Sequence, residues 1–268
     1  MATFGEYSDI GVTLEDYVAV VEIQRPPHNF FDFSLIAQIA DAFDALDESN
    51  SCRAIVLAAQ GKSFCAGANF GSGDDNDGDD AFSEEGFRTV THRLYSEGVR
   101  LFRSKTPVVG AIHGAAVGGG LGLALVPDFR VVCPETRFSA NFAKLGIHPG
   151  FGLTVTLPRL VGMQQAQRMF FTGCRIGGEE ALQIGLADKL VAQDEVRNAA
   201  VAFAREIAEN APLAVTSVRA TVRDGLADQV ARQTDHELKE QQWLRATEDA
   251  QEGIRAVSER RAGNFQGR

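Results

Sequence analysis

Apolar and polar positions along the first sixty residues alternate in the order expected of a strand, a helix and a second strand. Residues 17–23 (YVAVVEI) are rich in β-branched side chains and stop at the breaker Arg-Pro-Pro of residues 25–27, which predicts a strand followed by a turn. Asp32 can cap the helix that follows, whose apolar positions recur at three and four residues: Ile36, Ile39, Ala40, Phe43 and Leu46. Residues 53–59 (RAIVLAA) are a continuous apolar run, typical of a strand buried on both faces. This alternation favours an α/β fold.

The pattern repeats further along and then changes. The predicted order is a helix over about 83–103, a strand over 107–112, a glycine-rich turn over 113–120, a helix to Val126 and a strand over 130–133. From about Asp194 to Ala262 the periodicity is helical throughout. We therefore predict a ββα-type core over residues 1–193 and a helical subdomain over residues 194–268, as parts of one continuous domain.

One segment has the length of a membrane span. Residues 108–126 contain no formal charge over nineteen positions, and Gly110, Gly114 and Gly118 have the spacing of packed membrane helices. Six of the nineteen residues are glycine, prolines flank the segment, and no cluster of basic residues borders it. We interpret it as a buried strand that runs into a glycine-rich turn and a buried helix, and we expect no membrane partner.

Charge and cysteine usage narrow the function classes. The chain of 268 residues has a formal charge of −10, which argues against nucleic-acid binding. Half of that charge comes from five aspartates within residues 74–80, which we interpret as a solvated loop; a metal site there is the weaker alternative. The four cysteines are scattered and no N-terminal signal segment is apparent, so we expect a reducing, cytoplasmic location and no structural zinc.

Two glycine-containing turns each follow a predicted buried strand. They are residues 65–69 (CAGAN) and the Gly118-Gly119-Gly120 run, and the second opens a helix whose first amides have no internal acceptor. If the turns face each other, one amide from each can bind a carbonyl oxygen that becomes negative in a transition state. By spacing alone, a close-packed turn without a ligand is the better explanation of the glycines, and the run matches neither common phosphate-binding pattern.

Several linked motifs carry a resemblance to a known family. They are residues 63–69 (SFCAGAN), 105–125 (KTPVVGAIHGAAVGGGLGLAL), 127–130 (PDFR), 145–150 (LGIHPG), 157–162 (LPRLVG) and 259–265 (ERRAGNF). In order and spacing they resemble the crotonase, or enoyl-CoA hydratase/isomerase, family, and the resemblance covers essentially the whole chain. It implies a spiral of ββα units with a C-terminal helical trimerisation region, and a homotrimer or a dimer of trimers.

The resemblance also implies a ligand, an acyl-coenzyme A thioester, with no cofactor other than the coenzyme A of the substrate. By match of motif, the amides of Ala68 and Gly119 would form an oxyanion hole that stabilises an enolate. Other positions would bind the coenzyme A moiety: Arg25, Asn29, Cys65, Ala66, Gly67 and Arg261.

The sequence departs from the family at its two catalytic glutamates. Family hydratases place one two residues after the triple glycine and the other four residues before the glycine of the Leu-Gly-x-x-Pro-Gly motif; here these positions are Gly122 and Phe142. General acid–base groups contribute about 10²–10⁴-fold each. The replacements therefore argue against ordinary hydratase activity.

Three polar residues are candidates for the missing acid–base role: Asn141, His148 and His92, each with an ordinary structural or surface role as the alternative. Cys65 lacks an accompanying base pattern and is interpreted as an inert buried thiol rather than a nucleophile. The leading hypothesis is a lyase or isomerase that acts on an acyl-CoA through a stabilised enolate. The main alternative is an acyl-CoA-binding protein that does not catalyse.

Overall fold

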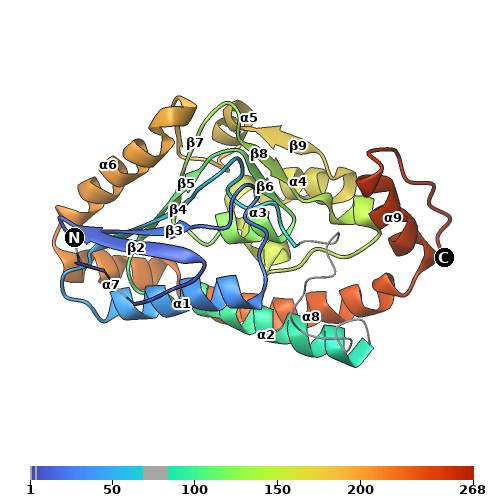
Figure 1. The fold of residues 1–268 in the computed structure, drawn as a ribbon, viewed down its shortest axis with the longest axis horizontal. Helices are drawn as coiled ribbons and strands as arrows, with labels where there is room; N and C mark the ends of the chain where they lie inside the picture. The colour runs from blue at the N-terminus through green and yellow to red at the C-terminus, as the bar shows by residue number, and fades with distance from the viewer. Residues whose placement is uncertain (1, 4, 69–83) are drawn as a thin grey trace.

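The computed structural model describes residues 2–3, 5–68 and 84–268, and their strands form two sheets (Figure 1). The aspartate loop of residues 74–80 and Asn69 lie outside the described residues. The larger sheet has the order β1 (Ala2–Thr3), β2 (Ile10–Glu15), β3 (Val18–Ile23), β4 (Ala54–Ala59), β5 (Val108–Ile112), β7 (Phe129–Val132) and β10 (Lys189–Leu190). The smaller sheet has the order β6 (Ala115–Val117), β8 (Arg137–Ser139) and β9 (Arg175–Gly177).

The chain passes between the two sheets as it advances. β5 lies in the larger sheet, β6 in the smaller one, and α3 (Gly119–Ala124) follows; β7 and β8 repeat the step before the 3₁₀ helix η2 (Asn141–Leu145) and α4 (Leu153–Thr172). The strands from β3 to β10 in the larger sheet are parallel, as connections through helices require. The predicted α/β fold and its ββα units are therefore confirmed.

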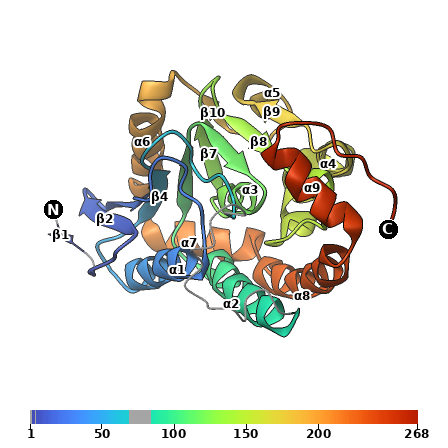
Figure 2. The same ribbon diagram turned by 45° about the vertical axis from the view of Figure 1, so that its right-hand side comes forward.

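Helices cover both faces of the larger sheet (Figure 2). Ala54, Val56 and Ala58 of β4 pack with the apolar face of α6 (Val196–Ala208), whereas Ile55 and Leu57 belong to the core that α1 (Phe33–Asp47) covers. Every residue of β4 is buried, which confirms the prediction of a strand buried on both faces. Asp32 caps α1 as predicted, because its carboxylate accepts a hydrogen bond from the amide of Leu35.

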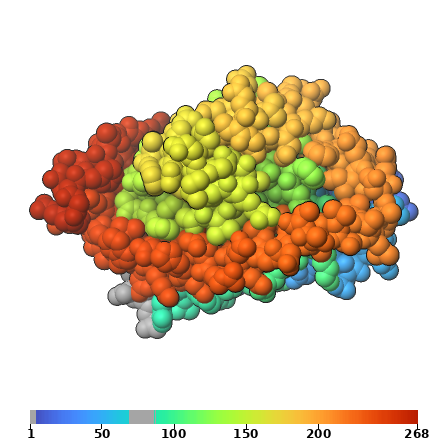
Figure 3. All heavy atoms as spheres, turned by 180° about the vertical axis from the view of Figure 1, so that it is seen from behind, coloured from blue at the N-terminus to red at the C-terminus, as the bar shows by residue number. Residues whose placement is uncertain are grey.

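The remaining helices lie outside the two sheets. They are α2 (Glu84–Arg103), α5 (Gly178–Gln183), η3 (Gln193–Glu195), α7 (Pro212–Val222), α8 (Leu226–Arg245) and α9 (Glu248–Ser258). Among them, α5 packs against β9 of the small sheet. α8 packs along α2 on one side and against α4 on the other; seen from behind, it runs beneath α4 (Figure 3). α9 packs on η2. The predicted boundary at residues 193 and 194 falls within η3, just after β10.

The apolar run of residues 108–126 is not one helix. It contains β5, β6 and α3, and its residues are largely buried in the core. β6 replaces part of the predicted turn, and α3 ends at Ala124 rather than Val126. In the part of the chain that the structure describes, no helix combines the length and the apolar character needed to cross a bilayer.

Candidate functional site

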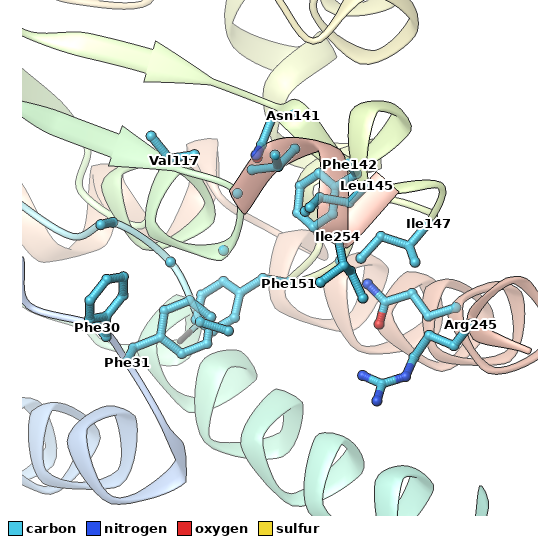
Figure 4. A pocket seen from close by; sticks show the side chains of 18 of the residues that line it. Phe30, Phe31, Val117, Asn141, Phe142, Leu145, Ile147, Phe151, Arg245 and Ile254 are labelled. Atoms are coloured by element: carbon cyan, nitrogen blue, oxygen red, sulfur yellow. The ribbon is translucent and has the colours of Figure 1, made fainter. Parts of the chain in front are cut away.

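A cavity of about 820 Å³ lies between the two glycine-containing turns, η2 and the C-terminal helices (Figure 4). This volume is within the range of pockets that enclose organic ligands. Backbone of the turns lines one end, through Ala66, Gly67, Ala68, Gly118 and Gly119. The rest of the wall is mainly apolar and includes Phe30, Phe31, Phe142, Leu145, Ile147, Phe151, Ile254 and Val257.

The two turns are held side by side by their own backbone. The amide of Cys65 donates to the carbonyl of Ala115 over 3.0 Å, and the amide of Val117 donates to the carbonyl of Cys65 over 3.1 Å. A β-carbon at Gly120 would lie 2.0 Å from the carbonyl oxygen of Cys65, and one at Gly67 would lie 2.7 Å from that of Val117. Glycine at these two positions is therefore a condition for the turns to approach this closely.

Ala68 and Gly119 each present an amide at this end of the cavity. Gly119 is the first residue of α3, so its N–H has no acceptor inside the helix. Gly118 precedes it with φ 57°, and its own amide is bound to the carbonyl of Ser139. Among the described residues, the amide of Ala68 has no hydrogen-bond acceptor. The structure thus brings together the two residues that the sequence analysis assigned to an oxyanion hole.

The two positions where the family has glutamate are apolar in space as well as in sequence. Phe142 lines the cavity, and Gly122 is buried one helical turn after Gly118. A β-carbon at Gly122 would lie 2.8 Å from Cδ1 and 2.9 Å from Cβ of Phe151. Phe151 therefore occupies the volume into which a side chain at position 122 would extend. Among the described residues that line the cavity, Glu259 is the one carboxylate, and it is paired with Arg261 at 2.6 Å.

Tyr95, Gln241 and Glu237 are buried polar residues that the sequence analysis missed. Tyr95 and Gln241 line the cavity, and the Tyr95 hydroxyl donates to Oε1 of Gln241 over 2.9 Å. Burial raises the pKa of Tyr95 above its usual value, so the phenol remains a neutral donor. One turn earlier on α8, Glu237 is fully buried, and burial raises the pKa of its carboxyl to about 7 although donors on Thr154 and Gly152 oppose the shift. The signal in the sequence is the spacing of Glu237, Gln241 and Arg245, which places them on one face of a helix.

Four of the six residues proposed to bind coenzyme A do not line the cavity: Arg25, Asn29, Cys65 and Arg261. Arg25 bridges Asp9 and Asp32, each at 2.7 Å. Asn29 is fully buried; its side chain accepts from the amide of Arg25 and donates to the carbonyls of Gln60 and Ser63. Arg261 is exposed and paired with Glu252 and Glu259.

Different arginines line the cavity: Arg175, Arg245 and Arg255. They come from β9, α8 and α9, and the sequence analysis did not select them. Only the fold brings these three positions to one cavity.

The polar candidates for acid–base chemistry separate in space. Asn141 lines the cavity beside Gly118 (Figure 4). His148 does not line it; its Nδ1 lies 2.7 Å from the carbonyl oxygen of Pro149, and its ring meets that of His236 edge-on. His92 is exposed and lines a smaller cavity between α2 and α8. Of the three, Asn141 alone is a neighbour of the paired turns.

Cys65 lies behind the turns rather than in the cavity. The side chain is fully buried, and burial raises the pKa of its thiol to about 12. Nucleophilic attack needs the thiolate, which is scarce at neutral pH when the pKa is this high. These properties are those of an inert structural thiol.

Comparisons with known proteins all find similarity to enoyl-CoA hydratases and their family. The family model described as enoyl-CoA hydratase/isomerase matches residues 13–268. The chain is 32% identical over 265 residues to the crotonyl-CoA hydratase of Syntrophomonas wolfei, covering 97% of this chain and 98% of that protein. It is also 32% identical over 263 residues to the short-chain-enoyl-CoA hydratase of Clostridium acetobutylicum, covering 96% of this chain and 97% of that protein.

A solved structure extends the likeness to the fold. The enoyl-CoA hydratase/isomerase of Pseudoalteromonas atlantica superposes with a TM-score of 0.82 at 27% identity, covering 97% of this chain and 100% of the other.

Proposed function

The chain belongs to the enoyl-CoA hydratase/isomerase family, and we propose that it binds an acyl-CoA thioester in the 820 Å³ cavity and stabilises its enolate. The observation that carries this proposal is the meeting of the Ala68 and Gly119 turns at one end of that cavity. The thioester oxygen accepts hydrogen bonds from both amides, which lowers the energy of the enolate and makes the proton at C2 more acidic. Backbone donors that the fold holds in place are well suited to this task.

Proton transfer is the step for which the cavity is poorly equipped. With Gly122 and Phe142 at the glutamate positions and Glu259 paired with Arg261, no described residue of the cavity wall offers an unpaired carboxylate to accept the C2 proton. We therefore propose lyase or isomerase chemistry with hydration of simple 2-enoyl esters much slower than in the hydratases it resembles. Packing of Phe151 against Gly122 favours the second candidate, an acyl-CoA-binding protein without turnover.

The decisive experiment combines binding with C2 exchange. Calorimetry with free coenzyme A and saturated acyl-CoA esters measures affinity, and mass spectrometry measures deuterium uptake at C2. Ala68→Pro removes the amide donor, whereas Ala68→Gly keeps it. Binding with exchange that Ala68→Pro abolishes and Ala68→Gly preserves supports the enolate proposal. Binding without exchange on any ester supports the binding protein, and absence of binding contradicts both.

We also propose a cytoplasmic homotrimer or dimer of trimers that needs no cofactor beyond the coenzyme A of its ligand. Large apolar side chains exposed on α7 and α4 support self-association: Leu213, Val218, Val222, Met163 and Phe171 are 61–84% exposed. Light scattering coupled to gel filtration tests the assembly, and a monomer at micromolar concentration would contradict it.

A further inference from the structure

Three phenylalanine rings cover the glycines around the first turn of α3. A β-carbon at Gly118 would lie 3.8 Å from Cζ of Phe142, and one at Gly119 would lie 2.2 Å from Cζ of Phe31. The ring of Phe151 covers Gly122 in the same way. An acyl group whose carbonyl oxygen reaches the Gly119 amide therefore meets aromatic carbon at the atoms that follow its carbonyl.

Phe151 is the ring most closely fixed by its surroundings. It is 2% exposed and packs between α2 and α3, where a β-carbon at Gly98 would lie 3.0 Å from Cε2 and Cζ of its ring. Its centroid is 5.7 Å from that of Phe31 and 6.3 Å from that of Tyr95, in an edge-on contact with Tyr95. Because glycines lie on both sides, this space admits a ring and little else.

The backbone of Phe151 is held in an unusual conformation. Its φ is 60°, in the left-handed region that a side chain of this size rarely adopts. Both oxygens of the buried Glu237 accept hydrogen bonds from the residues that follow Phe151. Oε2 accepts from the amide of Gly152 over 2.8 Å, and Oε1 accepts from the amide and the hydroxyl of Thr154 over 3.0 and 2.6 Å. On the other flank, Gln241 donates to the carbonyl of His148 over 3.0 Å. One face of α8 thus anchors the turn on both sides of Phe151.

We propose that Phe151 is the specificity-determining residue of the acyl cavity, with Glu237 as its positioning residue, and that together they select acyl-CoA esters with an unsubstituted apolar chain over 3-hydroxyacyl esters. This inference rests on the proposed function and names its substrate class. A 3-hydroxyl placed between Phe142 and Phe151 loses its water and meets aromatic carbon on both sides. The donors of the polar residues nearest Phe151 are already used, because Tyr95 donates to Gln241 and Gln241 donates to the carbonyl of His148. Asn141, the polar side chain beside Gly118, lies on the Phe142 side of this passage. The apolar chain instead continues toward Leu145, Ile147 and Ile254.

The test compares the dissociation constants of octanoyl-CoA and 3-hydroxyoctanoyl-CoA by calorimetry. We expect the intact protein to bind octanoyl-CoA about tenfold more tightly or better, because burying an unpaired hydroxyl is costly. Phe151→Ala admits water and lowers the ratio to below about threefold. Phe151→Gly suits the left-handed backbone and repeats the measurement if the alanine variant folds poorly. Leu182→Ala, at an exposed position of α5, leaves the ratio unchanged.

Glu237→Gln keeps the size of the side chain but turns one of its two accepting atoms into a donor facing backbone N–H groups. We expect it to lower the ratio without touching the ligand, while Glu240→Gln on the same helix does not. A ratio of two dissociation constants is independent of the folded fraction, so general destabilisation cannot produce the change. Equal affinities in the intact protein, or a ratio that Phe151→Ala leaves intact, overturn the specificity proposal and leave the proposed function standing. Binding of neither ester overturns both.

Discussion

The cavity wall has a backbone part, made by the two glycine-containing turns, and a side-chain part. In the backbone part, the amides of Ala68 and Gly119 lie on turns that backbone hydrogen bonds hold together. The close approach of these turns depends on Gly67 and Gly120, where a β-carbon has no room. Beside these turns the wall consists of side chains, and Phe142 and Gly122 stand at the two positions where the family has carboxylates. Donors supplied by the backbone depend on the fold, whereas proton-transfer groups depend on single side chains. A fold can therefore keep the capacity to polarise a thioester while the capacity to move protons disappears.

Restoring the two glutamates in the side-chain part of the wall has the largest expected effect, an increase in the rate of hydration. Gly122→Glu with Phe142→Glu places both carboxylates in the sequence, but Phe151 occupies the space that the first one needs. We expect the pair alone to give little hydration, and the triple variant with Phe151→Ala to hydrate crotonyl-CoA about 10²–10⁴-fold faster than the intact protein. Loss of the enoyl-thioester absorbance measures the rate. Equal rates for the double and triple variants would show that Phe151 does not block the site.

A substitution that separates the two turns of the backbone part has the next largest expected effect, a loss of stability. Gly120→Ala drives a β-carbon to within 2.0 Å of the Cys65 carbonyl oxygen, a backbone atom that moves only if the two turns separate. We expect a loss of about 3 kcal/mol in the free energy of unfolding, measured by urea denaturation. Gly177→Ala is the matched control, because no atom lies within 4 Å of the added carbon and the loss should stay below about 1 kcal/mol. Similar midpoints for the two variants would contradict the close approach of the turns.

Glu237, which holds the residues after Phe151 in the side-chain part of the wall, makes the stability of the protein depend on pH. Burial raises the pKa of this carboxyl in the folded protein to about 7 from an ordinary 4.5, so the folded state holds its proton more tightly than the unfolded state. The resulting stabilisation is complete below pH 4.5 and is lost as the pH rises through 7. We expect the free energy of unfolding to fall by about 1–3 kcal/mol over this window relative to Glu237→Gln. Parallel pH profiles for the two proteins would show that the carboxyl is not perturbed.

Cys65 should have the smallest effect of the four. Its thiol is buried behind the turns with a pKa of about 12, so Cys65→Ala should change acyl-CoA affinity and C2 exchange by less than about twofold. Calorimetry and mass spectrometry of the purified variant provide both numbers. A loss of a hundredfold or more with unchanged affinity would instead assign the thiol a chemical role.

The elements that the sequence predicted are those with long, regular patterns. β3, α1, β4 and β5 lie where periodicity and breakers placed them, because each buries at least one complete face. The three-residue strands β6, β8 and β9 are too short for a period to be visible, and their pairing depends on the two sheets meeting.

The candidate site divides in the same manner. The resemblance placed Ala68, Gly119 and Phe142, all of which line the cavity. Phe151 was missed because its effect arises from contact with Gly122, 29 positions earlier in the chain, that no local pattern reports. Gln241 and Glu237 were missed because polar residues on a buried helix face have the same spacing as polar residues on a face exposed to solvent.

The ring of Phe151 between Gly98 and Gly122 imposes an order on the mutations that the chain can accept. A side chain at position 122 collides with the ring while Phe151 is present, so a carboxylate there is harmful as a first step and tolerable only as a second one. Replacing Phe151 first opens a void and brings no catalytic gain of its own. Neither substitution alone brings hydratase activity closer. The packed ring of Phe151 therefore hinders a stepwise return of a carboxylate to position 122.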